Sequence, residues 1–388
     1  MRDKILHAEA QRRREKASCN LRALPEIPSP CLHPVFIRNM KYLKTYTPFA
    51  LECGSVLPEL EIAYTVYGTL NRQRDNVVWI AHALTANADP AEWWDSMVGP
   101  GKLFDPRRYF IVCANMLGSC YGATHPGSIQ PHNGRPYGRD WPLITVRDMV
   151  RSHQILQREL GIRRIHLGVG GSMGGQQILE WAVHDPELFE KIALIATNAR
   201  HSPWGIAFNE SQRMALRADS SLWSDQPDAG RAGLEAARAM ALLSYRNYPT
   251  YDRVQHDPDE KLEGFRATTY QQYQGLKLSR RFTAQSYWSL TKSMDSHNVG
   301  RGRGGAEKAL AVVKAETLVI GIQSDILFPI EEQIFLAEHI PGARLELIDS
   351  PYGHDGFLIE GDQLRKKVGD FLGQSAGQGA GKPEVLRA

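Results

Sequence analysis

The stretch GVGGSMGGQQILEW, residues 168–181, places one serine, Ser172, among five glycines and then continues into a helical pattern. The apolar run IHLGVGG (165–171) is typical of a buried strand, and GQQILEWAVHD (175–185) has the spacing of an amphipathic helix. Residues 170–174 therefore form a G-x-S-x-G turn between a strand and a helix, the context in which this motif has meaning. The turn needs small neighbours because strand and helix pass close together beside a strained serine.

This turn predicts that Ser172 is a catalytic nucleophile, raised above the sheet at the positive end of a helix. The alternative is a glycine-rich turn that binds phosphate or only packs tightly. A nucleophilic serine needs a base and an orienting acid, which follow it in the chain order Ser, acid, His. Asp325 comes directly after the apolar run 317–323, and His354 follows the run ending at residue 349, so both fit this order.

The oxyanion of an acyl transfer needs two N–H donors. The helix start offers the Met173 N–H, and the loop after the apolar run 77–84 offers the Leu84 N–H. Other candidates for the acid and the base fit the strand ends less well; they are Asp349, His201, His297 and His339.

Short apolar runs alternate with helical patterns along most of the chain. Several runs are apolar on both faces, as in parallel strands covered by helices. The predicted strands are 77–84, 109–116, 165–171, 191–197, 317–323 and 343–349, and the predicted crossover helices are 149–160 and 175–185. This order predicts an α/β fold with a doubly wound, mostly parallel sheet.

One long section, residues 201–298, interrupts the alternation: it lacks a buried strand but contains helical patterns such as 231–246. We expect a helical insertion there, between core segments 40–200 and 299–373. Residues 1–39 are rich in Arg and Pro with weak apolar periodicity, which predicts a disordered extension, and Met40 is a second candidate for the translation start. A basic amphipathic targeting segment is the functional alternative. The Gly/Ala-rich end, 374–388, predicts a flexible tail.

The composition excludes several classes of protein. A net charge of +3 without a basic stripe argues against nucleic-acid binding. Apolar runs stay below the roughly 18 residues that a membrane span needs. Five cysteines without C-x-x-C spacing indicate reduced thiols in a cytoplasmic protein, and His132, His201 and His297 lack the spacing of a metal site.

Longer motifs carry a resemblance to a known family. They include HALTANAD (82–89), PYGRDWPLITVRDMVRSH (136–153), GGSMGGQQILEWA (170–182), SYWSLTKSMD (286–295), and SDILFP with YGHDGF around Asp325 and His354. Over roughly Tyr42 to Leu372 the chain resembles the homoserine O-acetyltransferase family of the α/β-hydrolase fold. The resemblance implies a doubly wound sheet with a helical lid over 201–298, paired through the lid into a homodimer.

The resemblance also implies a ping-pong acyl transfer without a bound cofactor. Ser172 would accept the acetyl group of acetyl-CoA, with His354 as base and Asp325 holding the imidazole, and L-homoserine would then attack the acyl-serine. The family uses a lid arginine for the substrate carboxylate and an aspartate after the histidine for its amine. These positions correspond to Arg238 and Asp355, and a guanidinium suits a carboxylate.

Two departures from the family pattern lie near the substrate pockets: Ala86, where a glycine is common, and Trp204 on the approach to the lid. They leave open succinyl-CoA as donor and serine as acceptor. A hydrolase with water as acceptor and a binding protein that has lost its chemistry are the alternatives from other classes. The intact set of Ser172, Asp325 and His354 favours an enzyme over a binding protein.

Overall fold

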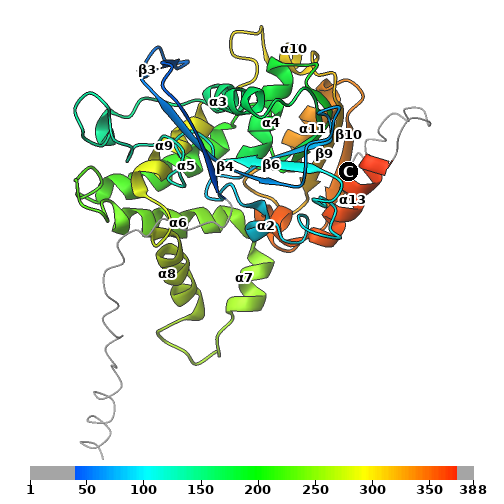
Figure 1. Cartoon of the computed structure of the whole chain (residues 1–388). Coiled ribbons are helices and arrows are strands. Elements are labelled where there is room, and N and C mark those ends of the chain that lie inside the picture. The colour runs from blue at the N-terminus through cyan, green and yellow to red at the C-terminus, as the bar shows by residue number, and fades with distance from the viewer. Residues whose placement is uncertain (1–39, 374–388) are drawn as a thin grey trace, which may run out of the picture. The chain divides into compact units, whose positions relative to one another are not determined.

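The computed structural model describes residues 40–373, which are built on an eight-stranded sheet (Figure 1). The strand order is β1-β4-β6-β5-β7-β8-β9-β10. The six strands from β6 to β10 in this order are parallel, whereas β4 pairs antiparallel with β6, and β1 with β4. The strands are β1 (Lys41–Thr45), β4 (Leu60–Tyr67), β5 (Val77–Ala81), β6 (Phe110–Ala114), β7 (Ile165–Gly171), β8 (Phe189–Ile195), β9 (Glu316–Ile322) and β10 (Arg344–Ile348). A small separate hairpin pairs β2 (Phe49–Ala50) with β3 (Val56–Leu57).

The centre of the sheet explains where a site can form. β5 is buried along its whole length and lies between β6 and β7. The chain passes from β5 to β6 on one side and then crosses to β7 on the other side, so the direction of winding changes at β5. In open α/β sheets ligands bind at such a switch point, beyond the carboxyl ends of the strands. Leu84 follows β5 and Ser172 follows β7 at this edge.

Alternate side chains of the inner strands point to opposite faces, and each face is covered by helices. On one face, Trp79 and Val112 pack with residues of α3 (Val146–Glu159), α4 (Met173–His184) and α11 (Ile330–His339). On the other face, Val78 and Ile111 share a core with α13 (Gly361–Gly373). The fold is therefore the doubly wound sheet that the sequence predicts.

All six predicted strands and both predicted crossover helices are confirmed, with small shifts at their ends. α3 begins at Val146, three residues earlier than predicted, because Thr145 and Asp148 form a capping box there. α4 begins at Met173, directly after Ser172. Strands β1 to β4 were not predicted from the sequence. The remaining short helices are α2 (Pro90–Trp93), η1 (Gly138–Asp140), α10 (Ala306–Leu310), η2 (Gly353–Asp355) and α12 (Gly356–Ile359).

Between β8 and β9 the chain forms the short helix α10 and, before it, five longer helices, and we call the segment of these five helices the lid. They are α5 (Pro203–Ala218), α6 (Arg231–Tyr245), α7 (Tyr248–Gln255), α8 (Arg266–Ser279) and α9 (Ala284–Asp295). The two ends of the lid lie side by side, because Arg200 bridges to Asn298 and the His201 N–H donates to the His297 carbonyl at 3.0 Å. Apolar residues of the lid share one core with Leu84 and Met173, which places the lid over the carboxyl edge of the sheet.

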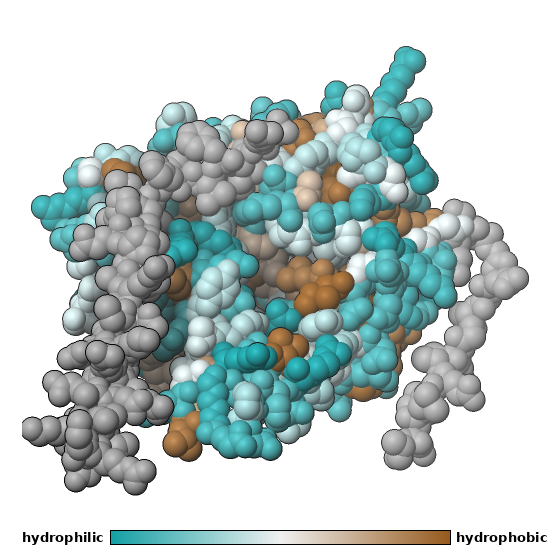
Figure 2. Space-filling model, turned by 90° about the horizontal axis from the view of Figure 1, so that it is seen from below, coloured by the Kyte–Doolittle hydropathy of each residue, from teal (hydrophilic) through white to brown (hydrophobic). Residues whose placement is uncertain are grey.

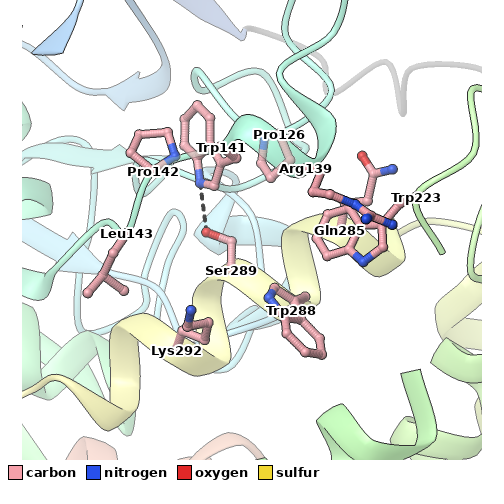
Figure 3. Close-up of a pocket in the computed structure, with 10 residues that line it drawn as sticks. All are labelled: Pro126, Arg139, Trp141, Pro142, Leu143, Trp223, Gln285, Trp288, Ser289 and Lys292. Carbon is pink, nitrogen blue, oxygen red and sulfur yellow. Dashed lines mark hydrogen bonds between the residues drawn. The ribbon is translucent and has the colours of Figure 1, made fainter. Parts of the chain in front are cut away.

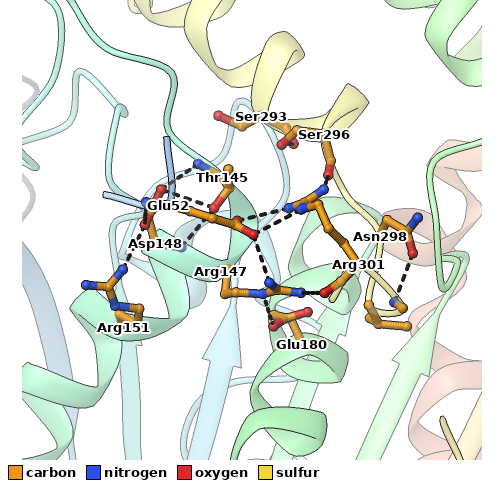
Figure 4. A network of polar contacts seen from close by, with 12 residues as sticks. Glu52, Thr145, Arg147, Asp148, Arg151, Glu180, Ser293, Ser296, Asn298 and Arg301 are labelled. Carbon is orange, nitrogen blue, oxygen red and sulfur yellow. Dashed lines mark hydrogen bonds and ion pairs between the residues drawn. The ribbon is translucent and has the colours of Figure 1, made fainter. Parts of the chain in front are cut away.

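A network of ion pairs fastens the hairpin β2–β3, helices α3 and α4, and the chain after the lid (Figure 4). Glu180, whose side chain is 2% exposed, accepts from Arg147 at 2.9 Å and from Arg303 at 2.7 Å. Glu52 accepts from Arg147 at 2.8 Å and from Arg301 at 2.9 Å. The buried Glu180 carboxylate is thus compensated by two guanidinium groups, which a buried charge requires.

Within residues 40–373 no helix has the length and apolar character needed to cross a membrane. Cys53, Cys113 and Cys120 are free thiols. The predictions for residues 1–39 and 374–388, including Cys19 and Cys31, fall outside the described residues.

Buried histidines predict loss of stability in mild acid. Burial lowers the pKa of His82 and His153 to about 4, and that of His201 and His297 to about 3, from an ordinary value of 6.5. As the pH falls below 6.5 the unfolded chain binds protons that the folded protein cannot, so folding stability is lost toward pH 4. Each histidine contributes about 1.4 kcal/mol per pH unit to this slope. Urea unfolding between pH 7 and pH 4.5 measures it.

His153 offers the control, because its ring packs against Trp79 and Trp181 and its Nε2 lies 2.9 Å from Gln177 Oε1. In His153→Leu we expect the unfolding free energy to change less steeply with pH, by about 1.4 kcal/mol per pH unit, the contribution of one histidine. An unchanged slope in this variant would contradict the assignment of the acid sensitivity to buried imidazoles.

Candidate active site

Ser172 lies at the junction of β7 and α4 in a backbone conformation that few side chains adopt. Its φ is +56° and its ψ −127°, and its side chain is largely buried. The Ser172 N–H donates to the Ile195 carbonyl at 2.9 Å, and its carbonyl accepts from Thr197 Oγ1 at 2.8 Å. The strained angle expected for the turn is present, and two hydrogen bonds to β8 and the loop after it hold it.

The glycines around Ser172 have no room for a side chain. A Cβ atom on Gly170 would lie 2.4 Å from the Gly174 carbonyl carbon, and one on Gly174 would lie 2.1 Å from the Ala81 carbonyl oxygen. A Cβ on Gly171 would lie 2.5 Å from the ring of Phe357. The turn therefore lies in contact with the end of β5, so Ser172 and the loop carrying Leu84 are neighbours.

Asp325 and His354 form a buried hydrogen-bonded pair. The His354 Nδ1–H donates to Asp325 Oδ2 at 2.6 Å, and both residues are 3% exposed. The other oxygen, Oδ1, accepts from the backbone N–H groups of Leu327 and Phe328 at 2.8 and 2.9 Å. Because the carboxylate can only accept, Nδ1 carries the proton and Nε2 is left to act as a base.

Aromatic rings enclose the imidazole. The ring of Phe328 stacks on His354 with centroids 5.0 Å apart, and the rings of Phe357 and Tyr245 lie 5.4 and 5.8 Å away. Asp325 follows β9 and His354 follows β10, at the same edge of the sheet as Ser172. The structure thus gathers the three residues predicted as nucleophile, acid and base at one end of the parallel strands.

Leu84 and Met173, the predicted oxyanion donors, lie in the turn after β5 and at the start of α4. Leu84 is in a turn closed by a hydrogen bond from the Ala86 N–H to the Ala83 carbonyl at 3.1 Å. Met173 is the first residue of α4, so its N–H has no acceptor within the helix. Both residues are buried in the core shared with the lid.

Arg238 and Asp355 lie near His354, with two partners that the sequence analysis missed. The Arg238 guanidinium lies 5.2 Å from the ring centroid of Tyr245, whose ring in turn neighbours His354. Asp355 forms an ion pair with Arg246 at 3.1 Å. Burial raises the pKa of Tyr245, an effect that the charge of Arg238 opposes. Tyr245 is the last residue of α6 and Arg246 its C-cap, so both lie about two helical turns after Arg238, and this spacing is the signal that the sequence offers.

The weaker sequence candidates have other partners. His201 bonds to Asn209 and packs on Phe328, whereas His297 lies 3.1 Å from the Asn198 carbonyl. Asp349 is exposed and its backbone bonds to Gln363, and His339 bonds to a carbonyl of its own helix. The described part of the chain contains no group of three or more His, Cys, Asp or Glu side chains that could hold a metal ion.

A pocket of about 120 Å³ lies elsewhere, between α9 of the lid and the loop around residue 141 (Figure 3). Three indole rings line it, those of Trp141, Trp223 and Trp288, and Trp141 Nε1 donates to Ser289 Oγ at 2.8 Å. Ser172, Asp325 and His354 do not line this pocket, so it is distinct from the candidate active site.

Comparisons with known proteins agree with this geometry. Residues 76–360 match the α/β hydrolase fold family. The homoserine O-acetyltransferase of Cyclobacterium marinum is 48% identical over 328 residues, which cover 84% of this chain and 93% of the relative. The crystal structure of homoserine O-acetyltransferase from Bacillus anthracis superposes with a TM-score of 0.80 at 26% identity, covering 88% of this chain and all of the other. Esterase E22 has the same TM-score at 22% identity, over 86% and 99% of the two chains, a likeness of fold alone. The predicted resemblance is therefore confirmed, and the chain belongs to the homoserine O-acetyltransferase family of the α/β-hydrolase fold.

Proposed function

We propose that the protein transfers an acetyl group from acetyl-CoA to the side-chain hydroxyl of L-homoserine. The observation that carries this proposal is the arrangement around His354. The base His354, oriented by Asp325, is followed in the chain by the anion Asp355. His354 also neighbours the Tyr245 ring, over which the cation Arg238 lies. An amino-acid acceptor carries the opposite charges on its carboxylate and ammonium groups. An ester hydrolase with water as acceptor has no use for such a pair.

In the first half-reaction, His354 Nε2 takes the proton of Ser172 Oγ as the oxygen attacks the thioester carbonyl. The negative oxygen that forms is bound by the N–H groups of Leu84 and Met173. The C–S bond then breaks, and CoA leaves as the thiol with the proton from His354. In the second half-reaction His354 removes the proton of the homoserine hydroxyl as its oxygen attacks the acetyl-serine carbonyl. The acyl C–O bond to Ser172 then breaks, and Ser172 Oγ takes the proton from His354.

Asp355 serves the acceptor although it is already paired. Arg246 Nη2 lies 3.1 Å from Oδ2, and a carboxylate with two oxygens can accept a further hydrogen bond, here from the homoserine ammonium group. The Arg246 side chain also fixes the rotamer of the aspartate before substrate arrives, which lowers the entropy lost on binding.

The experiment that tests the proposed function is release of CoA thiol by the purified protein. Acetyl-CoA and succinyl-CoA are each supplied with homoserine, with serine and without an acceptor. Fast release only with acetyl-CoA and homoserine supports the proposal. Faster release with succinyl-CoA would change the proposed donor, and faster release with serine would change the proposed acceptor. Equal release without an acceptor makes water the partner and contradicts acyl transfer.

A matched pair of lid variants tests the carboxylate clamp. In Arg238→Met we expect kcat/KM for homoserine to fall about 10- to 100-fold, because a hydrogen-bonded charge pair contributes about 1.5–3 kcal/mol. Acylation by acetyl-CoA alone should stay close to the wild-type rate. The control is Arg231→Met on the same helix, which removes only a half-exposed pair with Glu235. Equal effects of the two substitutions on homoserine use would contradict the role of Arg238.

We also propose that two chains associate through the lid. From the side on which α7 and α8 project, the surface is mostly hydrophilic, with apolar side chains around a central hollow (Figure 2). Several large apolar side chains of α6 to α8 and their connections are at least half exposed; they are Leu243, Tyr248, Val254, Leu262 and Tyr273. A second copy of this face could bury these exposed apolar side chains, which is the reason for the proposal. Sedimentation equilibrium tests the proposal, and a monomer at micromolar concentration would contradict it.

A further inference from the structure

The turn that carries Leu84 is held from the side of the sheet by a buried histidine. His82 Nδ1 lies 2.9 Å from the Ala83 carbonyl, and its Nε2 lies 3.2 Å from the Met116 N–H. The carbonyl can only accept and the N–H can only donate, so His82 is the neutral tautomer with its proton on Nδ1. The Ala83 carbonyl therefore accepts from both His82 and the Ala86 N–H.

This pair of hydrogen bonds aims the Leu84 N–H. The Ala83 carbonyl and the Leu84 N–H belong to one planar trans peptide unit, so they point in opposite directions. Fixing the carbonyl toward His82 consequently turns the N–H away from the strand. The peptide unit between Thr85 and Ala86 must also be fixed, since rotation about the backbone bonds of Thr85 would break the hydrogen bond from the Ala86 N–H to the Ala83 carbonyl.

The lid supplies this second hold. Arg281 lies in the connection between α8 and α9, and its Nη1 donates to the Thr85 carbonyl at 2.6 Å and to the Tyr121 hydroxyl at 2.5 Å. The neighbouring Phe282 is 2% exposed and packs on the rings of Tyr121 and Tyr287 at 5.5 and 6.3 Å. A buried aromatic anchor thus fixes the position from which Arg281 reaches the turn.

We propose that Arg281 is a positioning residue for the oxyanion hole, so that the lid itself completes the arrangement that stabilises the tetrahedral intermediate. This inference rests on the proposed function only in taking the Leu84 N–H as an oxyanion donor. Arg281 acts through the Thr85 carbonyl and contacts neither substrate nor the reacting atoms. Loss of one oxyanion donor costs about 100- to 1000-fold in rate, and a loosened donor costs part of that.

The test uses p-nitrophenyl acetate, which acylates a serine nucleophile and has no carboxylate or ammonium group for Arg238 and Asp355. We expect Arg281→Met to slow the acylation burst of the full-length protein about 10- to 100-fold with little change in KM. Arg281→Lys should recover part of the rate, because an ammonium group can still donate to one carbonyl. The control is Arg280→Met, which removes an exposed arginine from the same connection.

A second readout separates positioning from folding. A trifluoromethyl ketone that adds to Ser172 forms an oxyanion without turnover, so its affinity should fall in Arg281→Met by about the same factor as the acylation rate. Wild-type acylation and ketone affinity in this variant, or losses that only follow its unfolded fraction, would overturn the inference. The ester assay still applies if acetyl-CoA fails as donor, so failure of the proposed function is distinguishable from failure of this one.

Discussion

Ser172→Ala is expected to abolish acyl transfer and to leave the protein folded. Removal of the serine nucleophile of a Ser-His-Asp site lowers kcat by about 10⁶-fold, and the elbow between β7 and α4 carries no second hydroxyl side chain. The hydrogen bonds that hold the elbow use the backbone of Ser172, so alanine retains them. Release of CoA thiol and the mass of the protein after exposure to acetyl-CoA measure the two halves of the effect.

The mass measurement makes this test specific. Wild-type protein should gain one acetyl group that homoserine removes, and Ser172→Ala should gain none. Urea unfolding of the variant controls for folding and should give a midpoint close to that of the wild type. Turnover within tenfold of the wild type, or an acetyl group that homoserine removes from the variant, would contradict the assignment of Ser172 as the nucleophile.

Gly174→Ala is expected to prevent stable folding, contrary to the usual effect of this substitution in a helix. Alanine in place of glycine ordinarily stabilises a helix by about 1 kcal/mol. At Gly174 the added Cβ would lie 2.1 Å from the Ala81 carbonyl oxygen, a backbone atom of the central strand β5. Neither the strand nor the helix can move without breaking the packing of the core, so we expect a loss of more than about 3 kcal/mol.

Gly369 provides the matched control for this prediction. It lies in helix α13, and a Cβ there would meet only Leu103 Cδ1, at the ordinary contact distance of 3.6 Å. Gly369→Ala should therefore raise the free energy of unfolding by about 0.5–1 kcal/mol. The two variants should shift the urea midpoint in opposite directions. A stable Gly174→Ala protein with an active serine would show that the elbow tolerates a wider separation of strand and helix.

Strands β5 to β9 of the parallel part were predictable because they are buried on both faces and read as continuous apolar runs. β4 was missed for the opposite reason: in LEIAYTVY buried and half-buried residues are mixed, so no continuous apolar run marks it. β1 has no buried residue at all and takes its place through backbone pairing with β4. Edge strands of this kind depend on tertiary contacts that local patterns do not contain.

The candidate site divides in the same way. Ser172, Asp325 and His354 follow predicted strands, so their common position at one edge of the sheet comes from topology. The pairing of Arg246 with Asp355 joins the end of a lid helix to the loop after β10, and nothing in either segment alone indicates it. The hold of Arg281 on Thr85 is likewise a contact between chain segments nearly two hundred residues apart.

The adjacent ends of the lid have a consequence for how such proteins diverge. Because Arg200 and Asn298 pair in one β-bridge, the lid begins and ends at the same place on the sheet domain. Insertions, deletions and wholesale replacement between these two points leave the register of β8 against β9 untouched. We therefore expect that lid residues such as Arg238 can change without moving Ser172 or His354, provided that the new segment again supplies a donor to the Thr85 carbonyl, as Arg281 does.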